Sequence, residues 1–130
     1  MTTSLDSRRA LGNLGERLAA QHLTRAGYTI LATNFRTRFG ELDLVAVNSR
    51  CLVFCEVKTR IAGTRRGPDG PFDAIGPKKR LQVRAMAREW LASAEAGERP
   101  RPPELRFDAI GVLISRSGRL VSLDHLENAF

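Results

Sequence analysis

The chain has 130 residues, 42% of them hydrophobic and 27% charged, which suits one globular domain that needs neither disulfides nor a structural metal to fold. Lysine and arginine total 21 against 14 acidic residues, and the net charge of +7 favours a polyanionic partner, either nucleic acid or an anionic membrane surface. No apolar run reaches the length of a membrane span or of a signal-peptide core, so we expect a soluble, cytoplasmic protein.

The first half of the chain predicts one helix followed by three strands. Leu11, Leu14 and Leu18 recur at the spacing of one helical face, and His22 continues this stripe. Short apolar runs between turn residues then predict the strands. The expected bounds are 8–26 for the helix and 28–36, 40–47 and 51–58 for the strands.

The second half predicts a loop, a helix and two further strands. Residues 59–76 are rich in glycine, arginine and proline, which predicts an exposed loop. Pro77, a residue favoured in the first helical turn, begins a segment whose apolar face predicts a helix to residue 96. The face comprises Val83, Met86, Ala87, Trp90 and Ala94, and the strands are expected at 105–115 and 119–126.

The order of these elements is helix, three strands, helix, two strands. It predicts an α/β or α+β fold with one sheet flanked by helices. We expect residues 1–7 to form a flexible leader and residues 8–130 to form a single domain, because no internal repeat or low-complexity tract divides the chain.

Three charged residues, Asp43, Glu56 and Lys58, interrupt or end the two most apolar strands. Charged side chains are rarely buried unless they are paired or bind a cation. Side chains alternate across a strand, so Glu56 and Lys58 share one face. A hairpin loop of two residues at 49–50, or of four at 48–51, places Asp43 directly opposite Glu56, whereas a three-residue loop would shift this register.

Two opposed carboxylates, with Cβ atoms about 5 Å apart, repel each other unless a proton or a cation lies between them. Mg²⁺ takes a few carboxylate oxygens and keeps several waters, and Mn²⁺ is expected to substitute for it. Lys58 is placed to contact an attacking water or the negative charge that develops on phosphorus. The pattern therefore predicts metal-assisted phosphodiester hydrolysis, with solvated cross-strand charges as the alternative for so short a motif.

Basic residues are concentrated between residues 58 and 88, where nine lysines and arginines face two acidic residues and so account for the whole net charge of +7. Such a patch binds a phosphate backbone without reading sequence, and a solubilising helix face is the alternative. A membrane surface fits less well, because the helix has no large aromatic and leucine face beyond its core stripe. The residues expected to contact nucleic acid are Arg60, Arg65, Arg66, Lys78, Lys79, Arg80 and Arg84.

The two cysteines favour packing roles. In a strand, Cys51 and Cys55 would lie about 13 Å apart, which is too far for a disulfide. With only two histidines besides, a zinc site is not expected.

The remaining polar candidates also favour structural roles. Asp108 interrupts a strand and is expected to pair with an arginine such as Arg106 or Arg36. His22 lies on the apolar stripe of the first helix, where a core or boundary position is expected. We assign no role to His125, which has no evident partner in the sequence.

Three blocks of the chain carry a resemblance to a known family: "LGERLAAQHLTRAGYTILATNFRTRFGELDLVAVNSRCLVFCEVKTR", "AIGPKKRLQVRAMAREWL" and "LRFDAIGV". From about residue 12 to 111 the chain resembles the YraN family of small bacterial proteins. That family is similar to the PD-(D/E)xK restriction-endonuclease-like superfamily, and within it to the archaeal Holliday-junction resolvases. The resemblance implies a restriction-endonuclease-like α-β-β-β-α-β core, with a central mixed sheet flanked by helices.

The resemblance also implies roles for individual residues. Asp43 matches the metal-binding aspartate of the superfamily, Glu56 its second acid and Lys58 its catalytic lysine. Glu16, in "LGERLA", matches the first-helix glutamate that junction resolvases add to the metal site, and the main-chain carbonyl of Val57 is implied as a further ligand. A leucine precedes Asp43 where the signature has a proline, a residue that does no chemistry.

Together these features predict a Mg²⁺-dependent endonuclease that hydrolyses phosphodiester bonds in structured or branched DNA, in repair, recombination or DNA uptake. The alternative is a catalytically inactive nucleic-acid-binding accessory module, against which the complete set of site residues argues. An adaptor that binds only protein would leave the basic segment unexplained. The resolvase-like relatives imply a homodimer, although the sequence shows no dimer interface, and no membrane partner is expected.

Overall fold

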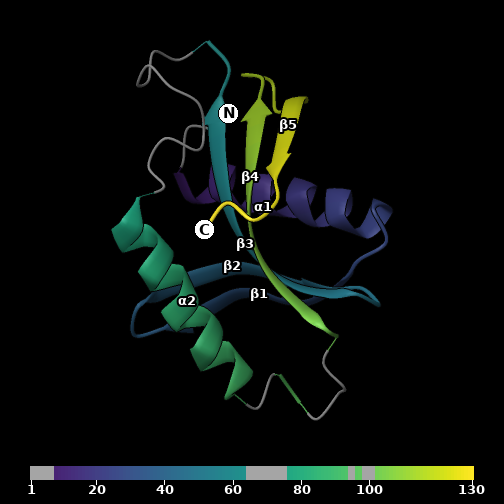
Figure 1. Ribbon diagram of the computed structural model, residues 1–130. Helices are drawn as coiled ribbons and strands as arrows, with labels where there is room; N and C mark the ends of the chain where they lie inside the picture. Colours follow the sequence, from purple (N-terminus) through teal and green to yellow (C-terminus); the bar gives the residue numbers. More distant parts are fainter. Residues whose placement is uncertain (1–7, 64–75, 94–95, 98–101) are drawn as a thin grey trace.

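The computed structural model describes residues 8–63, 76–93, 96–97 and 102–130, and this part of the chain forms the predicted order of elements (Figure 1). The expected leader and most of the expected loop lie outside the described residues. The elements are α1 (Arg8–Arg25), β1 (Thr29–Thr37), β2 (Gly40–Val47), β3 (Cys51–Ile61), α2 (Pro77–Leu91), β4 (Glu104–Ile114) and β5 (Leu120–Leu126).

The described strands form one open, mixed sheet in the order β1-β2-β3-β4-β5. β3 and β4 are parallel and have α2 between them in sequence, whereas the other neighbouring strands are antiparallel. A parallel pair needs such a long crossover, while antiparallel pairs need only short turns. The predicted fold class, a mixed sheet flanked by helices, is confirmed.

The two helices cover opposite faces of the sheet, with α1 passing behind the strands in Figure 1 and α2 in front. Phe54 of β3 packs against Trp90 of α2, and their ring centroids are 5.8 Å apart in an edge-to-face arrangement. Val53, on the other face of β3, lies in a core with Ala19 and Leu23 of α1. Because both faces are covered, β3 begins with five consecutive buried residues. Both cysteines lie among them and are free, as predicted.

Two element boundaries differ from prediction by more than one residue. β3 extends to Ile61 because it pairs with β4 along its whole length, up to Ile114. α2 ends at Leu91 instead of residue 96, because both the hydroxyl and the N–H of Ser93 bond the Trp90 carbonyl in a tight turn.

Neither helix in the described part of the chain is long and apolar enough to cross a membrane. Of the predicted α2 face, Val83, Met86, Ala87 and Trp90 are buried, and Ala94 lies outside the described residues.

The buried line of α1 also differs from the predicted leucine stripe. Gly15, Ala19 and Leu23 are buried at its centre, and the leucines of the stripe flank them in partly buried positions. Small residues let the helix backbone approach the sheet closely: a Cβ on Gly15 would lie 1.8 Å from Oγ1 of Thr59 in β3. The helix is therefore rotated so that its small residues face the sheet. The spacing of the leucines does not indicate this rotation, because it contains no information on how closely the helix approaches the sheet.

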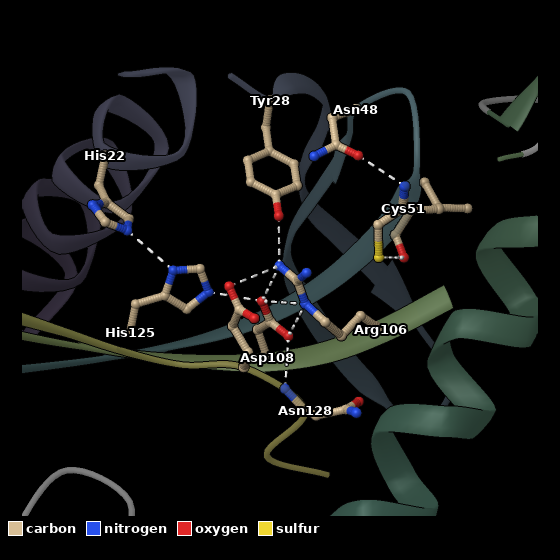
Figure 2. A network of polar contacts seen from close by, with 10 residues as sticks. His22, Tyr28, Asn48, Cys51, Arg106, Asp108, His125 and Asn128 are labelled. Atoms are coloured by element: carbon tan, nitrogen blue, oxygen red, sulfur yellow. Dashed lines mark hydrogen bonds and ion pairs between the residues drawn. The ribbon is translucent and has the colours of Figure 1, made fainter. Parts of the chain in front are cut away.

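A buried carboxylate is the centre of a polar network that links β4 to β5 and α1 (Figure 2). Asp108 of β4 is fully buried, and Arg106 donates to both of its oxygens at 2.9–3.1 Å, as predicted. His125 Nε2 lies 2.7 Å from the same carboxylate, and the Asn128 N–H donates to it at 3.0 Å. Burial acts to raise the pKa of Asp108, but these hydrogen bonds outweigh it and hold the pKa below its usual value.

The same network reaches α1 and the start of β1. The second ring nitrogen of His125 lies 3.0 Å from Nε2 of His22, and Arg106 donates to the Tyr28 hydroxyl at 2.6 Å. Nothing in the sequence indicated a role for His125, but the structure shows that this residue links β5 to both β4 and α1. Its partners are 17 and 103 residues away in sequence, so no local pattern indicates them.

The packing of α1 gives a matched pair of stability predictions. Gly15→Ala is expected to lower the free energy of unfolding by about 1–3 kcal/mol, because the added methyl group would overlap Thr59. Gly12→Ala on the same helix adds a methyl group that no atom of the described residues approaches within 4 Å, and is expected to raise that free energy by about 0.5–1 kcal/mol. Urea unfolding measures both, and similar effects of the two substitutions would contradict the close approach of α1.

Candidate metal centre

The hairpin between β2 and β3 has the register that the sequence predicts. Asn48 Oδ1 accepts hydrogen bonds from the N–H groups of Arg50 (2.9 Å) and Cys51 (2.8 Å), and the Asn48 N–H donates to the Cys51 carbonyl (3.0 Å). These bonds hold a two-residue turn. The paired residues end at Leu44 and Cys55. The next position on each strand carries one of the two predicted acids, Asp43 and Glu56, one step beyond the last paired residues.

Beyond that last pair the two strands separate. β2 remains paired with β1, and β3 remains paired with β4, so that β1 and β2 cross the lower part of Figure 1 while β3, β4 and β5 rise away from them. Asp43 lies at the separation, and its Oδ2 accepts the main-chain N–H of Val57 at 2.8 Å. The carboxylate thereby satisfies a backbone donor near the point where the β2–β3 ladder has ended.

Three carboxylates meet at this separation: Glu16 from α1, with Glu41 and Asp43 from β2. One oxygen of each lies within 4.8 Å of the other two, and all three residues are half-buried. The close packing of Gly15 on Thr59 brings this end of α1 to the sheet. Carboxylate oxygens are the ligands that hard divalent cations prefer, so this donor set can hold such an ion.

The charges in this cluster oppose one another. Burial and the charge of Glu56 raise the pKa of Asp43 to about 8, against the opposing hydrogen bond from Val57. Glu16 and Glu41 add to the rise. Burial likewise raises the pKa of Glu16, outweighing the hydrogen bonds that lower it. A bound proton or a cation relieves this repulsion.

Glu56 is not a member of this three-carboxylate cluster. Its Oε1 lies 3.0 Å from Nζ of Lys79 in α2. Its Oε2 is buried and has no hydrogen-bond partner among the described residues. Lys58 follows two residues later on the same strand and is exposed. The structure thus places Glu16 beside Asp43, and Glu56 close enough to raise the pKa of both.

Sequence reasoning missed two members of this site. The sequence did contain an indication of Glu41, because the alternation of side chains along a strand puts it on the same face as Asp43. Asn34 had none: it lies within β1 with a φ of 52°, a left-handed conformation that asparagine tolerates better than most residues. The neighbours of Asn34 pair with the neighbours of Asp43, so the two residues face each other across β1 and β2.

Asn34 also supports Glu16. A hydrogen bond from its side chain acts to lower the pKa of Glu16, against the effect of burial. Both residues line a surface hollow of about 610 Å³ between α1 and β1. The amide thus stabilises the ionised form of the one carboxylate that α1 contributes.

The first turn of α2 carries three of the predicted nucleic-acid contacts. Lys78 and Arg80 are exposed, and Lys79 is half-buried. The turn has no acidic residue, and Gly76 provides no side-chain cap. Positive charge at this end of a helix opposes the helix dipole, so an anion would be stabilised here.

The other predicted contacts have different surroundings. The guanidinium of Arg84 lies 4.6 Å from the ring centroid of Phe107 and donates to the Phe130 carbonyl at 2.9 Å. These contacts join α2 to β4 and to the C-terminal residue. Arg60 is half-buried on β3. Outside the described residues lie Arg65 and Arg66.

Residues 15–112 match the family described as "Uncharacterised protein family UPF0102". The chain belongs to the UPF0102 family. A UPF0102 protein from Parafrankia sp. (strain EAN1pec) is 46% identical over 121 residues, which cover 92% of this chain and 95% of the relative. UPF0102 proteins from Streptomyces griseus and Alkaliphilus oremlandii are 42% and 38% identical, over 91% and 92% of this chain and 94% and 97% of their own lengths. The resemblance to the YraN-like family is thereby confirmed, and the whole carboxylate cluster lies inside the matched region.

The raised pKa of Asp43 predicts how the stability of this UPF0102 protein depends on pH. The folded protein holds the proton up to about pH 8, whereas an unfolded chain releases it near pH 4. The contribution of Asp43 to the free energy of unfolding therefore falls as the pH rises from about 4 to about 8. Asp43→Asn should remove this part of the slope, measured by urea unfolding in EDTA. The exposed control Glu104→Gln should retain it, and an unchanged slope in Asp43→Asn would contradict the assignment.

Asn34 allows its backbone and its amide to be tested separately. Asn34→Gly keeps the left-handed conformation and removes the amide, whereas Asn34→Ala also introduces backbone strain of about 1–2 kcal/mol. We expect Asn34→Ala to be less stable than Asn34→Gly by about that amount, and both to raise the pKa of Glu16 in a carboxyl NMR titration. Equal stability of the two variants would argue against a strained backbone.

Proposed function

We propose that this UPF0102 protein is a divalent-metal-dependent endonuclease of the restriction-endonuclease-like superfamily, acting on structured or branched DNA. The observation that carries the proposal is the group of half-buried carboxylates where β2 and β3 separate, in which the pKa of Asp43 rises to about 8. Carboxylates are kept in such mutually unfavourable positions when a cation compensates them. The mixed sheet with α1 and α2 on its faces agrees with the superfamily resemblance.

The residues present fit a hard divalent ion such as Mg²⁺, with Mn²⁺ as a substitute. Asp43, Glu56 and Glu16 would hold it, with the main-chain carbonyl of Val57 as a further ligand. Glu41 would add a fourth carboxylate beside the ion. The Oε2 of Glu56 is buried without a hydrogen-bond partner in the described part of the chain, and it is an acceptor that such an ion would satisfy. Bound there, the ion supplies Lewis-acid stabilisation of the phosphate.

The chain's own cations would act on the substrate. Lys58, exposed beyond Glu56 on β3, would orient the attacking water and stabilise the charge that develops on phosphorus. Lys78, Lys79 and Arg80 would contact the phosphate backbone from the first turn of α2. These contacts carry no base readout, so selectivity would come from the shape of the nucleic acid.

A second candidate is a nucleic-acid-binding accessory module without catalysis. The ion pair between Lys79 and Glu56 favours it, because an internal cation already neutralises one of the expected ligands. On this hypothesis the acids bind no metal, and adding a divalent ion would leave the free energy of unfolding unchanged.

Cleavage assays separate the two candidates. Labelled single-stranded, duplex, flap and four-way-junction DNA is incubated with the protein in Mg²⁺, Mn²⁺ or EDTA. We expect metal-dependent cleavage that Glu56→Ala and Lys58→Ala each reduce by at least about 100-fold, with DNA binding retained.

Glu104→Gln provides the matched control, since it removes an exposed acid far along the chain from the cluster. Cleavage that survives in Glu56→Ala would refute the assigned site. Binding without cleavage, equal in all variants, would favour the accessory module.

A further inference from the structure

Lys79 differs from the basic residues around it because its charge is directed into the acidic site. Its side chain is 35% exposed and its ammonium lies 3.0 Å from Oε1 of Glu56, whose side chain is 16% exposed. Lys78 and Arg80, its neighbours in sequence, are both exposed. An ion pair in this setting is less screened by solvent than a surface pair.

The position of Lys79 within α2 is unfavourable for a cation. The residue lies in the first helical turn, which contains two other cations and no acid, so the helix dipole opposes all three charges. The contact with Glu56 offsets that repulsion for Lys79 alone among the described contacts of this turn. The pairing thus ties the start of α2 to β3.

The pairing leaves the acidic site incompletely compensated. One ammonium faces Glu56, whose second oxygen remains buried and unpartnered among the described residues. The charge of Glu56 is also one cause of the raised pKa of Asp43 and of Glu16. Of the four carboxylates, Glu56 pairs with Lys79 and Glu41 pairs with the exposed Arg36 at 3.7 Å, whereas Glu16 and Asp43 form no salt bridge among the described residues.

We propose that Lys79 is a positioning residue that holds Glu56 away from the other carboxylates and competes with the divalent ion for it. Loading of the metal then requires Lys79 to release Glu56, and the freed ammonium is left at the start of α2, where the DNA backbone is proposed to bind. This inference rests on the proposed metal centre. It assigns to Lys79 a regulatory contact that the other basic residues of the turn do not make.

The affinity for Mn²⁺ tests the proposal directly, measured by isothermal titration calorimetry on the full chain without DNA. Lys79→Gln should tighten Mn²⁺ binding by at least about fivefold, the lower end of a typical coupling between two sites. Lys78→Gln removes the same charge from the neighbouring exposed position and should change the Kd by less than about twofold. Lys79→Arg keeps a cation opposite Glu56 and should bind Mn²⁺ no more tightly than the wild type.

The double variant Lys79→Gln/Glu56→Gln provides the internal check, since without Glu56 the loss of Lys79 should no longer tighten binding. Equal Kd values for the wild type, Lys79→Gln and Lys78→Gln would overturn the role of Lys79 and leave the metal centre standing. No heat of Mn²⁺ binding in any variant would overturn the metal centre itself, and the role of Lys79 with it. If Lys79→Gln does not fold, tighter binding by Lys79→Arg would overturn the proposal, and unchanged or weaker binding would support it.

Discussion

The separation of β2 from β3 after the pair of Leu44 and Cys55 is the constraint on which the candidate site depends. While two strands remain hydrogen-bonded, opposed side chains are crowded and an acidic pair is strongly disfavoured. Once the strands part, Asp43 bonds the Val57 N–H, and the separation admits Glu16 from α1 and Lys79 from α2. A site built from both faces of a sheet requires such an opening.

The packing of the two helices determines which charges reach that opening. Gly15 lets α1 lie directly on Thr59, and a larger residue there would push the helix, and Glu16 with it, away from the sheet. On the opposite face, Trp90 and the other apolar residues of α2 pack in one core with Phe54. This packing fixes the position of α2 on the sheet and so allows Lys79 to contact Glu56. Hydrophobic packing, which is not directional, thus positions polar groups whose interactions are directional.

The two polar networks, one around Asp108 and one around Asp43, differ in how well their carboxylates are hydrogen-bonded. Asp108 receives hydrogen bonds from Arg106, His125 and the Asn128 N–H, and its pKa is held below the usual value. Asp43 accepts one from Val57, and its pKa rises instead. A fully bonded buried carboxylate rigidifies a fold, whereas an under-compensated cluster favours a cation. This contrast agrees with a structural role for the first network and with the metal-binding role that we propose for the second.

The sequence by itself determined the order of the elements and the class of the fold, because these follow from local periodicity. For a hairpin loop of two or four residues it also predicted the β2–β3 register, and the hydrogen bonds of Asn48 show that the loop has two residues. It therefore placed Asp43 opposite Glu56. The tertiary structure alone decided that Glu16 and Glu41 join Asp43, that Lys79 pairs with Glu56, and that Asn34 faces the site in a left-handed conformation. Most of these contacts join residues far apart in sequence, and the distances between them depend on how the helices pack on the sheet. The spacing of residues along the chain does not predict how the helices pack on the sheet.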